Sequence, residues 1–148
     1  MSRAVPEFGL AAAGKTYVLR EGSYGIIRNE SGFIAVVLTL KGAFLPGGGQ
    51  EPGESTKRAL IREVTEECGL AIRAIEFLGM ADELVFSPEE QTYFRKRCSF
   101  FIAEDQSHSG STTVGTEPDH KLVWLAPDEA MSQLSHESQR WALRAVLS

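Results

Sequence analysis

Apolar residues near the start of the chain occur in short runs, separated by the small and polar residues that are typical of turns. This pattern predicts short strands at residues 15–20 and 24–28, with Glu-Gly-Ser at residues 21–23 between them. Residues 33–40 are rich in β-branched and aliphatic side chains, which predicts a buried strand. A turn at residues 29–32 would join this strand to the one before it in a hairpin.

The spacing of the apolar residues then changes to that of a helix. It predicts a helix over residues 55–68, which Gly69 ends as a C-terminal cap. Residues 71–78 and 93–103 again have the composition of strands. The Ser-Pro-Glu-Glu sequence at residues 87–90 predicts the turn between these two strands.

The last part of the chain predicts one more strand and two helices. Residues 105–116 are rich in Ser, Thr and Gly, which predicts a flexible loop. Residues 122–125 predict a strand, residues 128–134 a short helix, and residues 136–147 a C-terminal helix whose Trp141 packs inward. Because helices precede and follow the strands, we expect an α/β fold, a mixed sheet in a helix–sheet–helix sandwich.

The predicted helix at residues 55–68 has two different faces. At 100° per residue, Glu63, Glu66 and Glu67 fall within an arc of about 100°, which they share only with Ala59. The apolar residues occupy a separate arc beside it: Leu60, Ile61, Val64 and Cys68. Like charges on adjacent turns destabilise an isolated helix by roughly 0.2–0.5 kcal/mol per pair, so the acidic face requires an explanation.

Two explanations of the acidic face remain open at this point. In the first, the three carboxylates bind a hard cation, Mg²⁺ or Mn²⁺ and also Ca²⁺, which oxygen-only ligation favours. In the second, the face is solvated and Arg58 and Arg62 pair with Glu66 or Glu54. The second explanation accounts for the arginines, but it does not account for the loop that precedes them.

That loop, at residues 45–54, contains three consecutive glycines, Gly47, Gly48 and Gly49. Glycine lets the backbone adopt positive φ and bring its own polar groups close to a ligand. The amides of such a run can bind an anion, and a glycine carbonyl can be a further oxygen ligand for a cation. A glycine loop that leads into a triple-acid helix therefore indicates a phosphate substrate bridged by a metal.

The segment that starts at Gly48 and ends at Leu70 resembles the signature of the Nudix hydrolase family. That signature is Gly, five residues, Glu, seven residues, then Arg-Glu-U-x-Glu-Glu-x-Gly-U, where U is a bulky aliphatic residue. This chain matches every defined position: Gly48, Glu54, Arg62, Glu63, Val64, Glu66, Glu67, Gly69 and Leu70. The sequences on either side, FIAVVLTLKGAFLPGG and EPDHKLVWLAPDEA, also resemble the family.

The resemblance implies the hydrolysis of a phosphoanhydride in a nucleoside diphosphate linked to another group. It implies that Glu63 and Glu67 ligate metal, and that Glu66 ligates metal or takes the proton of water. It also implies that the carbonyl of Gly47 is a ligand, and that Arg62 belongs to the catalytic group and pairs with Glu54. Which glutamate acts as the base stays open, because members of the family differ.

Outside the signature, the family often supplies a further acid from a loop. Glu117 is the first candidate for this acid and Asp119 the second, with a polar turn residue as the alternative. Arg95 is the candidate for binding a phosphate of the substrate, with Gly48 and Gly49; a solvated face is the alternative for the arginine. Strand alternation sends Lys96 to the face opposite Arg95.

Aromatic and histidine residues give weaker indications. Three aromatic side chains could stack on a base, but core packing is the stronger expectation for each: Tyr24, Phe44 and Phe94. The three histidines are scattered and are assigned no role: His108, His120 and His136.

Composition agrees with one compact domain over residues 1–148. With 43% hydrophobic and 24% charged residues, the 148-residue chain is of ordinary globular type. Its net charge of −5 disfavours indiscriminate binding to nucleic acid. The Nudix resemblance implies a small nucleotide as the partner. The N-terminus is a poor secretion signal, no apolar stretch suits a membrane, and only two cysteines occur, which together predict a cytoplasmic protein with reduced thiols.

The substrate is the least determined property. The spacings that mark the nucleotide-sugar and dinucleoside-polyphosphate branches of the family do not match, since Val85, Phe86 and Tyr93 stand at or after those positions. A MutT-like hydrolase of nucleoside triphosphates or related nucleotides remains by elimination. Removal of pyrophosphate from the 5′ end of RNA also stays open, although the acidic composition opposes a long RNA. The alternative is a non-catalytic module of the same fold that binds a nucleotide or nucleotide sugar. A monomer and a homodimer are both open.

Overall fold

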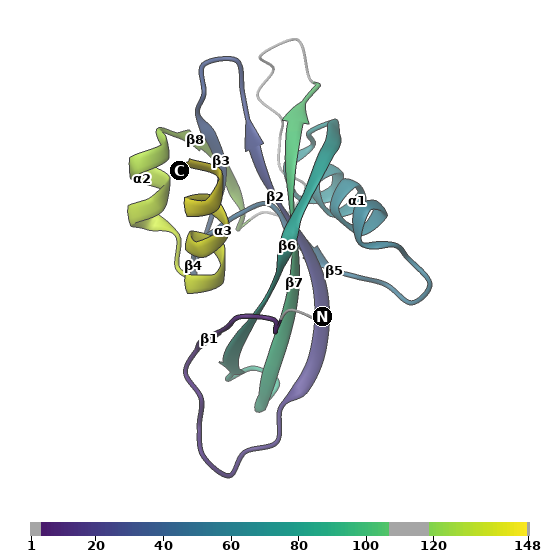
Figure 1. The fold of residues 1–148 in the computed structure, drawn as a ribbon, viewed down its shortest axis with the longest axis vertical. Helices are drawn as coiled ribbons and strands as arrows, with labels where there is room; N and C mark the ends of the chain where they lie inside the picture. Colours follow the sequence, from purple (N-terminus) through teal and green to yellow (C-terminus); the bar gives the residue numbers. More distant parts are fainter. Residues whose placement is uncertain (1–3, 107–118, 148) are drawn as a thin grey trace.

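The computed structural model describes residues 4–106 and 119–147. Within them the chain forms a long, twisted sheet and three helices (Figure 1). In chain order these elements are β1 (Glu7–Gly9), β2 (Val18–Arg28), β3 (Ile34–Thr39), β4 (Gly42–Phe44), β5 (Gly47–Gly49), α1 (Thr56–Cys68), β6 (Ile72–Ser87), β7 (Thr92–Asp105), β8 (Lys121–Leu125), α2 (Pro127–Gln133) and α3 (Glu137–Leu147).

The sheet lies between helices, with α1 on one side and α2 and α3 on the other (Figure 1). Its strand order is β1-β6-β7-β2-β3-β4, while β5 pairs with β2 and β8 pairs with β3. Parallel and antiparallel pairs both occur, since β2 is parallel to β7 and β6 is antiparallel to β7. The expected α/β sandwich with a mixed sheet is confirmed.

Each face of the sheet has its own hydrophobic cluster. On one face Leu60 and Val64 of α1 pack with Ile27 and Val37 from the sheet. The other cluster contains these fully buried side chains: Ile26, Val36, Phe100, Leu134 and Leu143. The predicted inward packing of Trp141 is confirmed, because its ring lies against that second cluster.

Capping residues mark both ends of helix α1. The side chain of Ser55 accepts a hydrogen bond from the backbone N–H of Arg58 at 3.1 Å, which caps the N-terminus. Gly69 has φ 67° at the C-terminus, and its N–H donates to the carbonyl of Thr65. The predicted helix, ended by Gly69, is therefore confirmed.

Two strand predictions were wrong. The expected break at residues 21–23 does not occur, because β2 continues through Gly22 and Ser23 and pairs with β7 along its whole length. The strand predicted to end at residue 78 continues to Ser87. Asp82 and Glu83, two charged residues beyond the predicted end, are 2% and 4% exposed. Asp82 is neutralised by arginines of β7, and Glu83 accepts a hydrogen bond from Ser138, so the strand can continue.

The expected glycine loop is in part a strand. Gly47–Gly49 form β5, which pairs antiparallel with Gly22, Ser23 and Tyr24 of β2. Gly47 has φ 149°, and a Cβ atom there would collide with the carbonyl of Ser23. This close approach fixes the glycine segment between β2 and α1.

Both cysteines, Cys68 and Cys98, are buried free thiols. Burial raises the pKa of the Cys98 thiol to about 12, so this side chain stays protonated and packs as an apolar group. None of the helices in the described parts of the chain is long and apolar enough to cross a membrane.

Candidate active site

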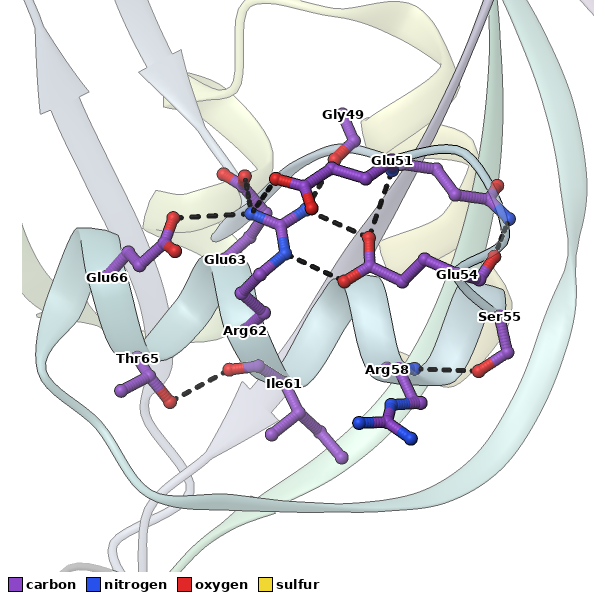
Figure 2. A network of polar contacts seen from close by, with 11 residues as sticks. Gly49, Glu51, Glu54, Ser55, Arg58, Ile61, Arg62, Glu63, Thr65 and Glu66 are labelled. Carbon is purple, nitrogen blue, oxygen red and sulfur yellow. Dashed lines mark hydrogen bonds and ion pairs between the residues drawn. The ribbon is translucent and has the colours of Figure 1, made fainter.

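Arg62 of α1 is the centre of a polar network that joins the helix to the glycine segment (Figure 2). Its guanidinium binds both carboxylate oxygens of Glu54, at 2.7 and 2.9 Å, and the carbonyl of Gly49 at 2.9 Å. Nη1 donates to Glu63 at 2.7 Å and to Glu66 at 3.3 Å. This one side chain therefore fixes the loop against the helix, as the Nudix resemblance implies for Arg62 and Glu54.

The charges in this network shift one another's pKa values. Hydrogen bonds from Arg62, followed by the backbone N–H of Glu51, lower the pKa of Glu54 from 4.5 to about 2. The hydrogen bonds to Glu54 and then Glu63 raise the pKa of Arg62 above its usual range. Glu54 and Arg62 therefore form a charged pair near neutral pH.

Three glutamates of α1 differ in their surroundings. The side chain of Glu66 is 56% exposed, whereas those of Glu63 and Glu67 are 21% and 11% exposed. Glu67 accepts a hydrogen bond from the backbone N–H of Gly47 at 3.2 Å. Glu63 fills the space beside Gly48 that a Cβ atom would otherwise take. The acidic face is thus a half-buried group pressed against β5, and only Glu66 remains largely solvated.

His120, which precedes β8, also contacts this group. Its Nδ1 lies 3.0 Å from Oε2 of Glu67. Sequence reasoning assigned His120 no role, because its partner is distant along the chain. The one available signal was its position in the segment before the predicted strand at residues 122–125, where an acid of the site was expected instead.

The two explanations of the acidic face can now be compared. Among residues 4–106 and 119–147, Arg62 and not Arg58 makes the ion pairs of this face. Its partners are Glu51, Glu54, Glu63 and Glu66. One guanidinium cannot neutralise four carboxylates, and Glu67 adds a fifth negative charge nearby. A solvated, self-compensated face therefore does not describe the site, and the chemistry of the donors suits a hard cation.

Within residues 4–106 and 119–147, however, no group of three or more His, Cys, Asp or Glu residues is arranged to hold a metal ion. The carboxylate oxygens are directed to protein partners instead: those of Glu63 to Arg62, and those of Glu67 to Gly47 and His120. The residues fit a cation in donor type and position, provided that Arg62 and His120 give up part of their contacts. Glu117, the expected further acid, lies outside the described residues.

A cavity of about 700 Å³ opens next to Glu67 and Gly47. Its volume suits a small organic ligand. Its walls carry aromatic rings and cations from both halves of the chain: Arg20, Tyr24, Lys41, Phe44, Phe86, Phe94, Lys96, His120 and His136. The three aromatic residues considered for base stacking therefore line one cavity, although Phe94 is only 3% exposed and also serves the core.

The tip of the β6–β7 hairpin forms one side of this cavity. Glu89 makes an ion pair with Lys41 at 2.8 Å, and Glu90 makes one with Arg20 at 3.2 Å. All four residues line the cavity. Two exposed ion pairs therefore tie the hairpin tip to β2 and to the turn between β3 and β4.

Arg95, the residue expected to bind phosphate, lies elsewhere. Its guanidinium binds Glu7 at 2.5 Å and Asp82 at 3.0 Å, and it does not line the cavity. Arg97 binds the same Asp82 at 2.9 Å. Alternation along β7 places Lys96 on the opposite face, as predicted, and Lys96 lines the cavity. The cation that β7 presents to the cavity is therefore Lys96, and not Arg95, the residue chosen from the sequence as the phosphate ligand.

The fold and the α1 network together define a family. The family model for the NUDIX domain matches residues 19–146, which extend from the second residue of β2 to the last but one residue of α3. The chain belongs to the Nudix family.

Individual relatives agree with this assignment. A putative 8-oxo-dGTP diphosphatase of Bacillus subtilis strain 168 is 33% identical over 109 residues. The match covers 72% of this chain and 66%, just under two thirds, of that relative.

Solved structures of low identity share the fold. A NUDIX hydrolase from Nitrosomonas europaea superposes with a TM-score of 0.67 at 17% identity, covering 86% of this chain and 87% of that one. The E. coli dihydroneopterin triphosphate pyrophosphohydrolase superposes with a TM-score of 0.68 at 19% identity, covering 84% of this chain and 92% of that one.

Proposed function

We propose that this protein hydrolyses a phosphoanhydride bond in a nucleoside diphosphate linked to another group, with a nucleoside triphosphate as the first substrate class. The proposal includes Mg²⁺ as the cofactor, with Mn²⁺ as the substitute. It is supported by membership of the Nudix family and by similarity to a relative named as a putative 8-oxo-dGTP diphosphatase.

One observation carries the proposal. The half-buried carboxylates of Glu63 and Glu67 meet the glycine strand β5, and the cavity of about 700 Å³ begins at the same place. An excess of negative charge beside a cavity with aromatic walls suits a substrate whose phosphates arrive together with a cation. The nucleoside would then occupy the cavity, and the phosphates would lie over α1.

In this mechanism Glu63 and Glu67 hold the cation, with the carbonyl of Gly47 as a further oxygen donor. A bound divalent cation supplies neutralisation of the phosphate charge and a lowered pKa of water. Arg62 holds Glu63 and Glu54 in place, so the carboxylates are oriented before the substrate arrives. Phosphoryl transfer needs little else from the protein, because positioning and charge stabilisation supply most of the catalysis.

Glu66 is the better placed of the two candidates for the base. Its side chain is 56% exposed and is held by Arg62 at the longest of the hydrogen bonds in this network, 3.3 Å. A solvated carboxylate can accept a proton from water and release it to solvent. Glu63, bound to Arg62 at 2.7 Å, is less free to do so.

The domain organisation, the cellular compartment and the oligomeric state are also part of this proposal. Residues 1–148 form a single Nudix domain that acts on a small-molecule nucleotide in the cytoplasm, as a monomer or homodimer. The two buried free thiols are consistent with a reducing compartment.

A non-catalytic nucleotide-binding module is the second candidate. One observation favours it: the described residues include no preformed metal group, since Arg62 and His120 occupy the carboxylates. In such a module the glutamates would position the loop and would not hold a cation for catalysis.

Phosphate release from a panel of substrates separates the two candidates. The panel contains canonical and oxidised nucleoside triphosphates, ADP-ribose, dinucleoside polyphosphates and a 5′-triphosphate RNA, each with Mg²⁺, with Mn²⁺ and with EDTA. We expect metal-dependent turnover of a nucleoside triphosphate. Absence of turnover across the panel, with ligands that still raise the melting temperature, would favour the binding module.

A further inference from the structure

Three cations line the cavity, and their surroundings differ. Arg20 is paired with Glu90 and Lys41 is paired with Glu89, so the β6–β7 hairpin tip neutralises the positive charge of both residues. Lys96, by contrast, makes no side-chain hydrogen bond or ion pair to any residue within 4–106 or 119–147. Lys96 is only partly exposed, in the middle of strand β7. An ammonium group that lines a cavity without a protein partner is available to a ligand with an oxygen or nitrogen acceptor.

The nearest candidate for a protein partner is already engaged. Glu83 stands opposite Lys96 in the pairing of β6 with β7. Its carboxylate is 4% exposed, and Oε1 accepts a hydrogen bond of 2.8 Å from the backbone N–H of Ser138 at the start of α3. Glu83 therefore binds a backbone N–H at the N-terminus of α3. The ammonium donors of Lys96 remain available to a ligand in the cavity.

Other polar groups on this side of the cavity also offer donors. Gln139 lines the cavity, and its Oε1 accepts from the backbone N–H of Leu45 at 2.7 Å, which leaves the amide Nε2 as the group it can offer. Burial lowers the pKa of His136, so near neutral pH the imidazole is uncharged, with one donor and one acceptor nitrogen. Together with Lys96, these residues form a set richer in donors than in acceptors.

The same part of the cavity is aromatic. Phe44 packs edge to face on His136, with ring centroids 4.9 Å apart. Phe86 is 44% exposed and lines the cavity, so a ring face or edge is available to a flat ligand. Arg20 lies over the ring of Phe94 at 4.0 Å. Aromatic walls suit a heterocyclic base better than a second phosphate, which would be better served by further free cations.

On these grounds we propose that Lys96 determines base specificity by donating to a ring carbonyl oxygen of the substrate, so that the cavity selects 6-keto purines over 6-amino purines. This inference rests on the proposed function for the presence of a nucleotide in the cavity. An ammonium group can donate to the O6 oxygen of guanine or hypoxanthine, whereas the amino group of adenine at the same position is a donor and would repel it. A hydrogen bond from a charged donor discriminates by about tenfold to a hundredfold.

The test compares inosine 5′-triphosphate with ATP, because their bases differ at the 6-position that Lys96 is proposed to contact. We measure kcat/KM for both with Mg²⁺ in the wild type, Lys96→Met, Lys96→Arg and Lys57→Met. Lys57 is exposed and does not line the cavity, so Lys57→Met is the matched control. We expect the wild type and Lys57→Met to prefer inosine triphosphate by about tenfold or more. Lys96→Met should bring the ratio close to one through loss of activity on inosine triphosphate, and Lys96→Arg should keep the preference.

Two results would overturn the inference. The first is a wild type without preference between the two nucleotides. The second is a Lys96→Met variant that loses activity equally on both, which would assign Lys96 to a phosphate or to the fold. Binding of both nucleotides is also measured by calorimetry with Ca²⁺ in place of Mg²⁺, because the negative charge of the site requires a cation to accompany the phosphates. A Lys96-dependent difference in Kd without turnover would end the proposed hydrolysis and leave the base selection standing. No turnover and no difference in binding would end both.

Discussion

Two arginine–carboxylate networks in this protein differ in charge balance: one has an excess of negative charge and the other is neutral. In the active-site network Arg62 faces Glu51, Glu54, Glu63 and Glu66, so one cation meets four anions. In the second network Arg95 and Arg97 share the buried Asp82, and Arg95 also binds Glu7, so two cations meet two anions. For convenience we call the second the β7 network. The excess of negative charge, more than the presence of ion pairs, distinguishes the site from a structural cluster.

The difference also explains why Arg95 was an attractive but misplaced candidate. From the sequence, Arg95 and Arg62 are equally plausible ligands of phosphate or carboxylate. In the structure the charge of Arg95 is already satisfied by Asp82, whose side chain is 2% exposed. Burial raises the pKa of Asp82, but the hydrogen bonds from Arg97 and Arg95 outweigh it and lower the pKa overall. A neutral, internally paired network has little to offer a charged ligand. The predictions below test this contrast.

The largest expected effect is on turnover. Glu67→Gln removes one of the two half-buried carboxylates while it keeps the shape of the side chain, so hydrolysis should fall by about 10²–10³-fold. The melting temperature should change little, because one source of like-charge repulsion is removed. Steady-state phosphate release and thermal unfolding measure the two effects. Glu76→Gln, at an exposed position on β6, is the control, and unchanged turnover in Glu67→Gln would refute the assignment.

The β7 network should show the reverse behaviour. Asp82→Ala leaves Arg95 and Arg97 without their shared partner. The arginine side chains are 33% and 32% exposed, so water can solvate part of their charge and limits the destabilisation. We expect a loss of about 2–4 kcal/mol in the free energy of unfolding. Turnover per folded molecule should stay near that of the wild type. Urea unfolding and kinetics below the transition provide the measurement. A variant with intact stability and reduced kcat would give Asp82 a place in catalysis.

Mg²⁺ should stabilise only the network with excess negative charge. At ten to a hundred times its Kd, a ligand of the native state adds about 1.4–2.7 kcal/mol of stability. We expect MgCl₂ to raise the melting temperature of the wild type and of Asp82→Ala, relative to KCl of equal ionic strength. The Glu63→Gln, Glu67→Gln double variant should lose this shift. An equal shift in the double variant would place the cation elsewhere.

The smallest effect is a pH dependence at Glu54. Its pKa is about 2 in the folded protein against 4.5 for the ordinary group, so its ionised form is favoured by folding. The stability it contributes is complete above its ordinary pKa and is lost as the pH falls through the folded pKa. The difference in unfolding free energy between wild type and Glu54→Gln should therefore be constant near pH 7 and shrink from about pH 4.5 to about pH 2. A pH-independent difference would mean that Glu54 acts through packing.

Helix α1 and its acidic face could be predicted from the sequence because their signals are local. The apolar spacing and Gly69 determined where the helix runs, and the i, i+3, i+4 spacing placed Glu63, Glu66 and Glu67 on one face. The contact between Arg62 and Glu54 followed from the family signature. Short-range geometry was sufficient for this part of the site.

The remaining parts depend on contacts between distant segments. The length of β6 could not be read from the sequence, because Asp82 looks like the residue of a loop until Arg95 and Arg97 are placed beside it. The contact of His120 with Glu67 joins residues far apart in the chain. The cavity likewise combines β2, β7 and α3, so the partnerless position of Lys96 became apparent only in three dimensions.

Gly47 and Gly48 are glycines for different reasons, and this affects how the site can vary. Gly47 is required by its own backbone, with φ 149° and no room beside Ser23. At Gly48 the limiting neighbour is a side chain, the carboxylate of Glu63. Positions 48 and 63 are therefore coupled: in a library that varies both, a larger residue at position 48 should be enriched after folding selection together with a shorter residue at position 63. Glu63, a candidate cation ligand, thereby also limits the size of the residue at position 48.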